Sequence, residues 1–166
     1  MTIIAETPRL TIRLFKPLEE KIYLDLFEDE RVTQYLPNRS RDELRMVFFE
    51  YLNPAPKGNV TGRWGVFNNV DKDFIGLCLL RPFDDGSGSI ELGYVFRHKY
   101  WGKGLASEMG EALLKQMLKI KPDAHFVAVT EHGNVPSQRV LEKLGMKRDG
   151  NYVRNGIDLA FFKMDR

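Results

Sequence analysis

The segment FRHKYWGKGLASEMG, residues 96–110, places basic side chains around two closely spaced glycines, Gly102 and Gly104. Because glycine has no Cβ, the backbone N–H groups of such a loop can approach a ligand closely. A helix that begins near Gly104 adds the unpaired N–H groups and the positive dipole end of its first turn. The pattern predicts a phosphate or pyrophosphate site, and a strand-to-helix turn with solvated lysines is the alternative. The basic residues are Arg97, His98, Lys99 and Lys103.

Two common nucleotide-binding motifs do not fit this loop. A P-loop requires Ser or Thr directly after its lysine, whereas Lys103 is followed by Gly104. A dinucleotide-binding fingerprint requires a third glycine at a position that is occupied here by Ser107. We therefore expect neither of these two nucleotide-binding folds.

Cysteine and histidine, which often serve as nucleophiles or metal ligands, are few in this chain. Cys78 is the single cysteine and lies in the apolar run FIGLCLL, where a thiol usually behaves as a small hydrophobe. His98, His125 and His132 show neither metal-ligand spacing nor a pattern of supporting carboxylates. The sequence predicts no metal site, no cysteine nucleophile and no internal disulfide.

Apolar patterns indicate the elements that must position the loop. Residues 103–120 carry apolar side chains along one helical face, and Pro122 ends the run. Ser40 and Glu43 form a capping-box pattern at the start of another helix. The apolar face consists of Leu105, Met109, Leu113, Met117 and Ile120. Expected strands cover 9–15, 62–70, 73–83, 88–97 and 125–131, with two more around Asn155 and Gly156, and expected helices cover 18–29, 40–52, 103–120 and 134–145.

The resulting order β, α, α, β, β, β, α, β, α, β, β predicts a mixed α/β class with an antiparallel meander. With 166 residues and 43% hydrophobic content, the chain suits one domain over residues 1–166. The net charge of +2 argues against a nucleic-acid binder, and the most apolar window is far too short to cross a membrane. The N-terminus has no signal-peptide pattern, so we expect a soluble, cytoplasmic protein.

Several motifs in the right order resemble a known superfamily. The run ELGYVFRHKYWGKGLASE, followed by NVPSQRVLEKLGM, resembles the acetyl-CoA binding core of the GNAT superfamily of N-acetyltransferases. The opening TPRLTIRLF and the Trp-Gly-Val of the second expected strand resemble the branch that includes the ribosomal-protein N-terminal acetyltransferases. The resemblance implies a three-layer fold, with helices on both faces of a mixed, mostly antiparallel sheet of about seven strands. It also implies that the fourth and fifth strands splay apart.

The resemblance further implies a set of residues that contact acetyl-CoA. The family loop [QR]-x-x-G-x-[GA] maps onto Lys99, Gly102 and Gly104, with lysine in place of Gln or Arg. Asn134 matches the position that hydrogen-bonds the pantetheine arm, although an N-cap is its structural alternative. The complete set is Tyr94, Val95, Phe96, Lys99, Tyr100, Trp101, Gly102, Lys103, Gly104, Leu105, Ala106, Asn134, Ser137, Arg139 and Lys143. Within it, Arg139 and Lys143 are assigned to the 3′-phosphate, and solvated helix cations are the alternative.

Catalytic roles follow from the same resemblance. Glu91 matches the acidic position that takes the amine proton directly or through water, and a surface strand glutamate is the alternative. The backbone N–H of Val95 is expected to donate to the thioester carbonyl. Family members often carry a tyrosine acid where this chain has Leu141, so Ser137 is expected to steady the departing thiolate or relay a proton. Tyr152 is the other candidate for the missing acid.

The resemblance implies an acetyl-CoA dependent N-acetyltransferase that transfers the acetyl group directly to a primary amine, without a metal. One alternative is a catalytically silent acyl-CoA binding or sensor module of the same fold. The acceptor, a protein N-terminus or a small molecule, is expected to contact residues 31–41 and 151–156, because such loops carry specificity. The acceptor's identity, the use of other acyl-CoAs, and the choice between monomer and homodimer stay open.

Overall fold

The computed structural model describes residues 2–164, whose strands form an eight-stranded sheet in the order β1-β2-β3-β4-β5-β6-β8-β7. The strands are β1 (Ile3–Glu6), β2 (Leu10–Arg13), β3 (Gly62–Asn68), β4 (Phe74–Pro82), β5 (Ile90–Phe96), β6 (Phe126–Thr130), β7 (Met146–Arg154) and β8 (Ile157–Met164). The helices are α1 (Glu20–Leu26), α2 (Glu30–Thr33), α3 (Arg41–Glu50), α4 (Leu105–Ile120) and α5 (Val135–Lys143), with 3-10 turns η1 (Pro17–Glu19) and η2 (His98–Tyr100).

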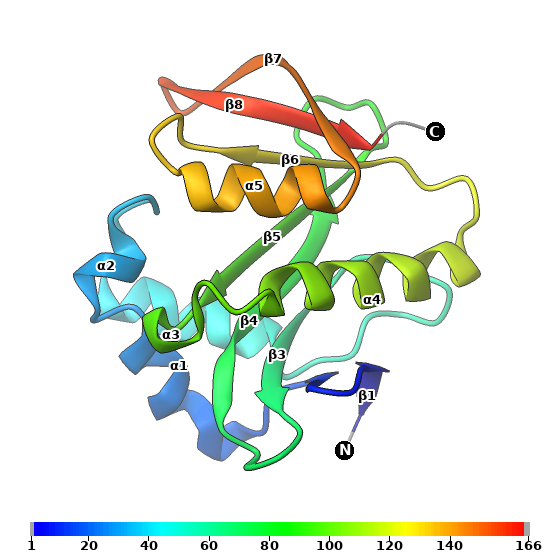
Figure 1. Ribbon diagram of the computed structural model, residues 1–166. Helices are drawn as coiled ribbons and strands as arrows, with labels where there is room; N and C mark the ends of the chain where they lie inside the picture. Colours follow the sequence, from blue (N-terminus) through cyan, green and yellow to red (C-terminus); the bar gives the residue numbers. More distant parts are fainter. Residues whose placement is uncertain (1, 165–166) are drawn as a thin grey trace.

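Helices cover both faces of the sheet (Figure 1). The long helix α4 crosses one face against β1 and β2, and α5 lies on the same side against β6 and β7. On the other face, α1 packs against α3 and β4. The predicted mixed, mostly antiparallel sheet between helical layers is therefore confirmed.

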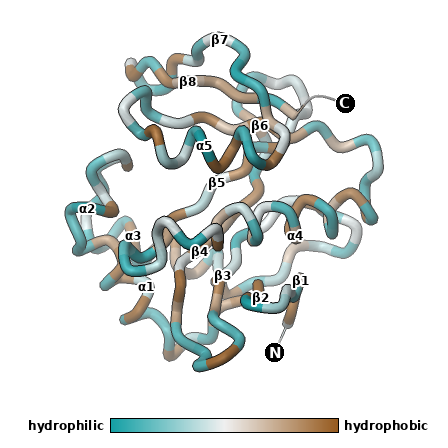
Figure 2. Tube along the Cα trace, viewed as in Figure 1, coloured by the Kyte–Doolittle hydropathy of each residue, from teal (hydrophilic) through white to brown (hydrophobic). Residues whose placement is uncertain are grey.

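Each face of the sheet has its own hydrophobic core. One core gathers around α4 and includes Met109 and Leu113, which are fully buried. The other gathers around Phe15 and receives aromatic side chains from α1, α3, β3 and β4. Figure 2 shows hydrophobic residues along the central strands and mostly hydrophilic residues along β7. Ile120, the last residue of the predicted apolar face of α4, is 44% exposed because the chain leaves the helix there.

The sheet opens between β5 and β6. These two strands pair in parallel only at Ile90 with Phe126 and at Glu91 with Val127. Beyond Glu91, β5 continues beside β4 and β6 continues beside β8. The fourth and fifth strands expected from the sequence are β5 and β6, because β1 was not predicted, so the predicted splay between them is confirmed. Within the described residues, one edge of β5 has no strand neighbour from Leu92 onward.

The structure adds two elements that the sequence did not reveal. The edge strand β1 raises the sheet from the predicted seven strands to eight, because four residues pair with β2. The short helix α2 is capped by the Asp29 side chain, which accepts a hydrogen bond from the Arg31 N–H. The first predicted helix is also shorter than 18–29. The other predicted elements are present within a few residues of their expected bounds. In the part of the chain from residue 2 to 164, no helix has the length and apolar character needed to cross a membrane.

Candidate active site

The glycine loop joins η2 to α4 and is open to solvent. Gly102 and Gly104 have φ values of +73° and +76°, a left-handed conformation that glycine adopts without steric cost. Gly104 is the N-cap of α4 and offers no capping side chain, so the N–H groups of the first turn are available to an external acceptor. A Cβ added at Gly102 would meet no heavy atom within 4 Å. The loop therefore has the open backbone surface that a pyrophosphate site requires.

Arg9 approaches this loop from the N-terminal hairpin. Its Nη1 donates to the Lys103 carbonyl at 3.0 Å, and its Nε donates to Glu108 at 2.8 Å. A Cβ placed on Gly104 would lie 3.7 Å from Nη2 of Arg9. The sequence did not indicate that Arg9 lies beside the glycine loop, although the TPRLTIRLF run that contains it carried part of the family resemblance. The guanidinium group therefore lies beside the helix N-terminus, where it is paired with Glu108 of the first turn.

The side chains that precede the glycines are mostly engaged with Asp73 or the backbone. Lys99 and Tyr100 both donate to Asp73, at 3.1 and 2.5 Å, and the Trp101 indole donates to the Phe96 carbonyl. Burial alone would raise the pKa of Asp73, but hydrogen bonds from Tyr100 and Lys99 hold it below its usual value. Lys99 is therefore paired with a carboxylate in this structure. Tyr100 and Trp101 fix the shape of the loop.

Tyr94, Val95 and Phe96 form the end of β5 that β6 does not accompany. The Phe96 side chain is buried in the core around α4, Val95 faces the opposite core, and Tyr94 is partly buried. Their exposed backbone edge leads into the loop at residues 97–104. Along this edge the backbone groups of Tyr94 and the N–H of Phe96 face outward, because Ile90, in the same alternation, donates to the His125 carbonyl on the β6 side. The expectation that the Val95 N–H donates to the thioester carbonyl is wrong, because Val95 pairs with Leu77 and its N–H lies on the β4 side of the strand.

The first turn of α5 faces this edge. Asn134 is the N-cap, and its Oδ1 accepts the Ser137 N–H at 3.3 Å, which is the structural role weighed in the sequence. This cap uses the amide oxygen, and the amide NH2 is a separate donor. The hydroxyl groups of Ser137 and Tyr94 lie 3.0 Å apart, although the two residues come from different elements. Arg139 and Lys143 are exposed farther along α5.

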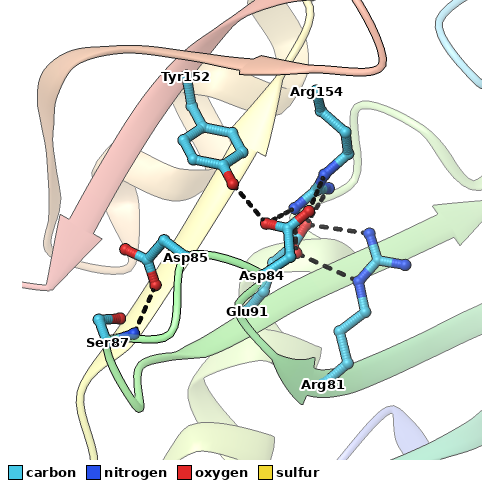
Figure 3. Close-up of polar contacts among 7 residues, drawn as sticks. All are labelled: Arg81, Asp84, Asp85, Ser87, Glu91, Tyr152 and Arg154. Atoms are coloured by element: carbon cyan, nitrogen blue, oxygen red, sulfur yellow. Dashed lines mark hydrogen bonds and ion pairs between the residues drawn. The ribbon is translucent and has the colours of Figure 1, made fainter.

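Glu91 occupies the point where β5 and β6 part, and it is only 3% exposed. Its carboxylate accepts hydrogen bonds from Arg154 at 2.8 and 3.0 Å and from Arg81 at 3.2 Å (Figure 3). Arg154 also binds Asp84, which accepts a hydrogen bond from the Tyr152 hydroxyl at 2.8 Å. Glu91 is therefore not the surface glutamate of the alternative reading, and Tyr152 is directed at Asp84 instead of at Ser137.

The charges of this cluster shift several pKa values. Burial would raise the pKa of Glu91, but hydrogen bonds from Arg154 and Arg81 hold it below its ordinary value. The hydrogen bond from Arg154 lowers the pKa of Asp84 to about 2. Both carboxylates are thus charged at neutral pH. Cys78, by contrast, is fully buried, and burial raises the pKa of its thiol.

The two predicted acceptor segments both lie near this opening. Arg154, in the 151–156 segment, reaches Glu91, and Tyr35, in the 31–41 segment, lies against Gly133 in the β6–α5 loop.

Among residues 2–164, no cluster of three His, Cys, Asp or Glu side chains is suited to hold a metal ion.

Comparison with known proteins gives a consistent result. The family model for the acetyltransferase (GNAT) domain matches residues 9–147. The chain is 30% identical over 148 residues to the uncharacterized N-acetyltransferase YnaD of Bacillus subtilis, and the match covers 89% of this chain and 85% of that protein.

Solved structures share the fold over nearly the whole chain. A GNAT-family acetyltransferase from Bacillus anthracis has a TM-score of 0.79 and 27% identity, and the match covers 99% of this chain and 98% of that one. A ribosomal-protein-S5-alanine acetyltransferase from Vibrio fischeri has a TM-score of 0.77 and 18% identity, covering 95% and 93%. An aminoglycoside acetyltransferase in complex with coenzyme A has a TM-score of 0.76 and 14% identity, covering 95% of each chain. Because the family model spans most of the sequence and the relatives align along nearly all of it, this chain belongs to the GNAT family of acetyltransferases.

Proposed function

We propose that this chain transfers the acetyl group of acetyl-CoA directly to a primary amine, with residues 1–166 acting as one domain. The observation that carries the proposal is the course of β5. This strand loses β6 as a neighbour after Glu91 and then runs directly into the glycine loop. A thioester arm laid along its edge would end with its pyrophosphate at the N-terminus of α4, where the N–H groups are oriented for an anion.

Each part of acetyl-CoA has candidate partners along this path. The backbone N–H groups of residues 102–106 are proposed for the pyrophosphate, with Arg9 beside them. The backbone of Tyr94 to Phe96 is proposed for the pantetheine arm, together with the Asn134 amide. The exposed cations Arg139 and Lys143 are proposed for the 3′-phosphate. Because Lys99 is paired with Asp73 and Leu105 is buried, we expect the loop to bind mainly through its backbone.

The reaction needs a neutral amine, whereas an alkylamine with a pKa of about 10.4 is almost wholly protonated at pH 7. Glu91 is our candidate for accepting that proton. Both of its oxygens are hydrogen-bonded to guanidinium groups, so we propose that it acts through a water molecule. The N–H groups of Tyr94 and Phe96, on the open edge of β5, are proposed to stabilise the negative charge on the carbonyl oxygen, and Ser137 the charge on the departing sulfur.

The acceptor is proposed to be a protein N-terminus or a small-molecule amine. The relatives named for an aminoglycoside and for a ribosomal protein resemble this chain equally well in fold, with TM-scores of 0.76 and 0.77. Fold similarity therefore gives no preference between these acceptors. The assignment to the branch that includes the ribosomal-protein enzymes is based on the sequence motifs. The acceptor is to be identified by a direct screen.

A catalytically silent acyl-CoA binding module is the second candidate, because buried Leu141 stands where many family members have a tyrosine acid. The test has two stages. In the first, a thermal-shift titration should show stabilisation by acetyl-CoA, about 2.7 kcal/mol at 100 times Kd. In the second, CoA thiol release is measured against peptides, polyamines, amino acids and aminoglycosides, and products are identified by mass spectrometry.

Each outcome has a definite meaning. Binding followed by amine-dependent thiol release supports the proposed transferase. Binding without turnover on any acceptor class favours the silent module. The absence of a thermal shift at millimolar acetyl-CoA would contradict both candidates.

A further inference from the structure

A hydrogen bond joins the two elements that flank the proposed acetyl-CoA path. The hydroxyl oxygens of Tyr94, on β5, and Ser137, in the first turn of α5, lie 3.0 Å apart. Tyr94 belongs to the part of β5 that has lost β6 as a neighbour. The contact therefore bridges two elements at the point where the sheet provides no strand pairing.

The backbone around this contact holds Ser137 in place. Its N–H is bonded to the Asn134 side chain, which caps the helix, and Tyr94 approaches the hydroxyl from β5. A hydroxyl group has one proton and two acceptor sites. When Tyr94 donates its proton to Ser137, the serine proton is free to point toward a third group.

The direction of these hydrogen bonds follows from the acidity of the two groups. Burial raises the pKa of Tyr94 to about 12, so the phenol stays protonated throughout the neutral range. A CoA-like thiol has a pKa of about 8.5, so its thiolate is too weak a base to take the Tyr94 proton. An anion beyond Ser137 would instead align both hydroxyls toward itself, and hydrogen bonds arranged in such a chain strengthen one another.

Neither of the other two positions considered for a phenolic acid supplies a hydroxyl group to Ser137. Leu141 is 2% exposed and packs in the core around α4, so no polar group stands at the family's usual acid position. The hydroxyl of Tyr152 donates to Asp84. Tyr94 is the phenol that contacts Ser137.

We propose that Tyr94 is a positioning residue that orients the Ser137 hydroxyl toward the departing CoA thiolate. The inference rests on the proposed function and specifies how one half of its site works. In the reaction a C–N bond forms, the C–S bond breaks, and the proton lost by the amine nitrogen ends on sulfur by way of water. Tyr94 keeps its own proton, and its contribution is to stabilise the sulfur's negative charge through Ser137.

The test measures the acidity of the CoA thiol in the binary complex, without any acceptor, by the ultraviolet absorbance of the thiolate as pH rises. Bound to the wild type, the thiol pKa should fall by about one unit relative to free CoA. In Ser137→Ala and in Tyr94→Phe, most of that shift should be lost. Tyr23→Phe removes a buried phenol hydroxyl from the core on the opposite face of the sheet and serves as the matched control, with a wild-type shift.

Turnover gives the second readout. We expect Tyr94→Phe to lower kcat about tenfold and Ser137→Ala to lower it up to about 100-fold, with KM for acetyl-CoA nearly unchanged. The double variant should be no slower than Ser137→Ala, because Tyr94 acts through that hydroxyl. Ser137→Thr, which retains a hydroxyl, should recover part of the loss.

The failure of this inference is distinguishable from failure of the proposed function. If CoA binds and is released in turnover while Tyr94→Phe matches the wild type in thiol pKa and kcat, the positioning role is wrong and the transferase stands. Additive losses in the double variant would also overturn it. If CoA does not bind the wild type, both proposals fall together.

Discussion

The guanidinium group of Arg154, on β7, makes two hydrogen bonds of 2.8 and 3.0 Å to the carboxylate of Glu91, on β5. The same guanidinium binds Asp84 in the β4–β5 turn. These contacts tie the β7–β8 hairpin to the place where the sheet opens. Arg154 thus binds two carboxylates, and Glu91 is the one that lies at the last β5–β6 pair. The proposed chemical role of Glu91 can therefore be tested separately from its structural role.

Glu91→Gln should lower kcat/KM by about 100-fold, near the lower limit for a positioned base, because its ion pairs already make it a weak one. Raising the pH should restore part of the rate, since more of the acceptor is then neutral. Asp84→Asn removes the other anion from Arg154 and is the matched control. Equal losses in the two variants across the pH range would show that Glu91 acts only by holding Arg154.

The same variant tests a pH dependence of stability. A carboxylate whose pKa is lowered by folding contributes stability above its unfolded pKa, and this contribution is lost as the pH falls through the folded value. For Glu91 the loss of this stability should begin near pH 4.5, the ordinary pKa of a glutamate, and continue at lower pH. Glu91→Gln should therefore cost about 2 kcal/mol at neutral pH, because it leaves two guanidinium groups under-compensated, and less in acid.

Urea unfolding of both proteins at pH 7 and at about pH 3.5 measures this difference. Glu111→Gln, which changes an exposed glutamate on α4, controls for net charge. A Glu91→Gln deficit that is constant between the two pH values would contradict the ion-pair account.

Gly104→Val should impair CoA binding more than it impairs folding. The new side chain would stand at the N-cap of α4 and cover the first-turn N–H groups, so Kd should rise at least about tenfold, equivalent to about 1.4 kcal/mol. Gly86→Val is the matched control, because Gly86 has a φ of +74° and open space around it but lies in the β4–β5 turn. Both variants should lose a similar amount of stability, and calorimetry should find the CoA defect in Gly104→Val alone.

Arg9→Gln should weaken CoA binding about tenfold, because a charge-assisted contact near the pyrophosphate is lost along with the hydrogen bond to the Lys103 carbonyl. The remaining affinity should depend less on ionic strength than that of the wild type. Arg45→Gln serves as the control, since Arg45 is a comparably exposed arginine in a surface ion pair with Glu20. Wild-type affinity in Arg9→Gln would remove Arg9 from the proposed site.

Local features of this protein were predictable because they depend on residues close together in the chain. The buried face of α4 follows from helical spacing, and the β7–β8 turn follows from Asn155 and Gly156, which have φ values of +51° and +78°. The helix start at Asn134 and the glycine loop also depend on only a few consecutive residues. Candidate residues of the loop and of α5 could therefore be named, and their spacing supported the family resemblance.

The tertiary structure decided the partners of those residues, because strand order and register bring together groups that no local pattern links. Arg9 meets the Lys103 carbonyl across 94 positions, and Arg154 meets Glu91 across 63. The same long-range packing made Glu91 a buried ion-pair partner instead of a surface strand residue, and pairing with β2 made an edge strand of residues 3–6. Residue types and local periodicity determined which groups this protein has for its chemistry. The separation of β5 from β6 after two residue pairs determined which of these groups face one another, as Tyr94 and Ser137 do.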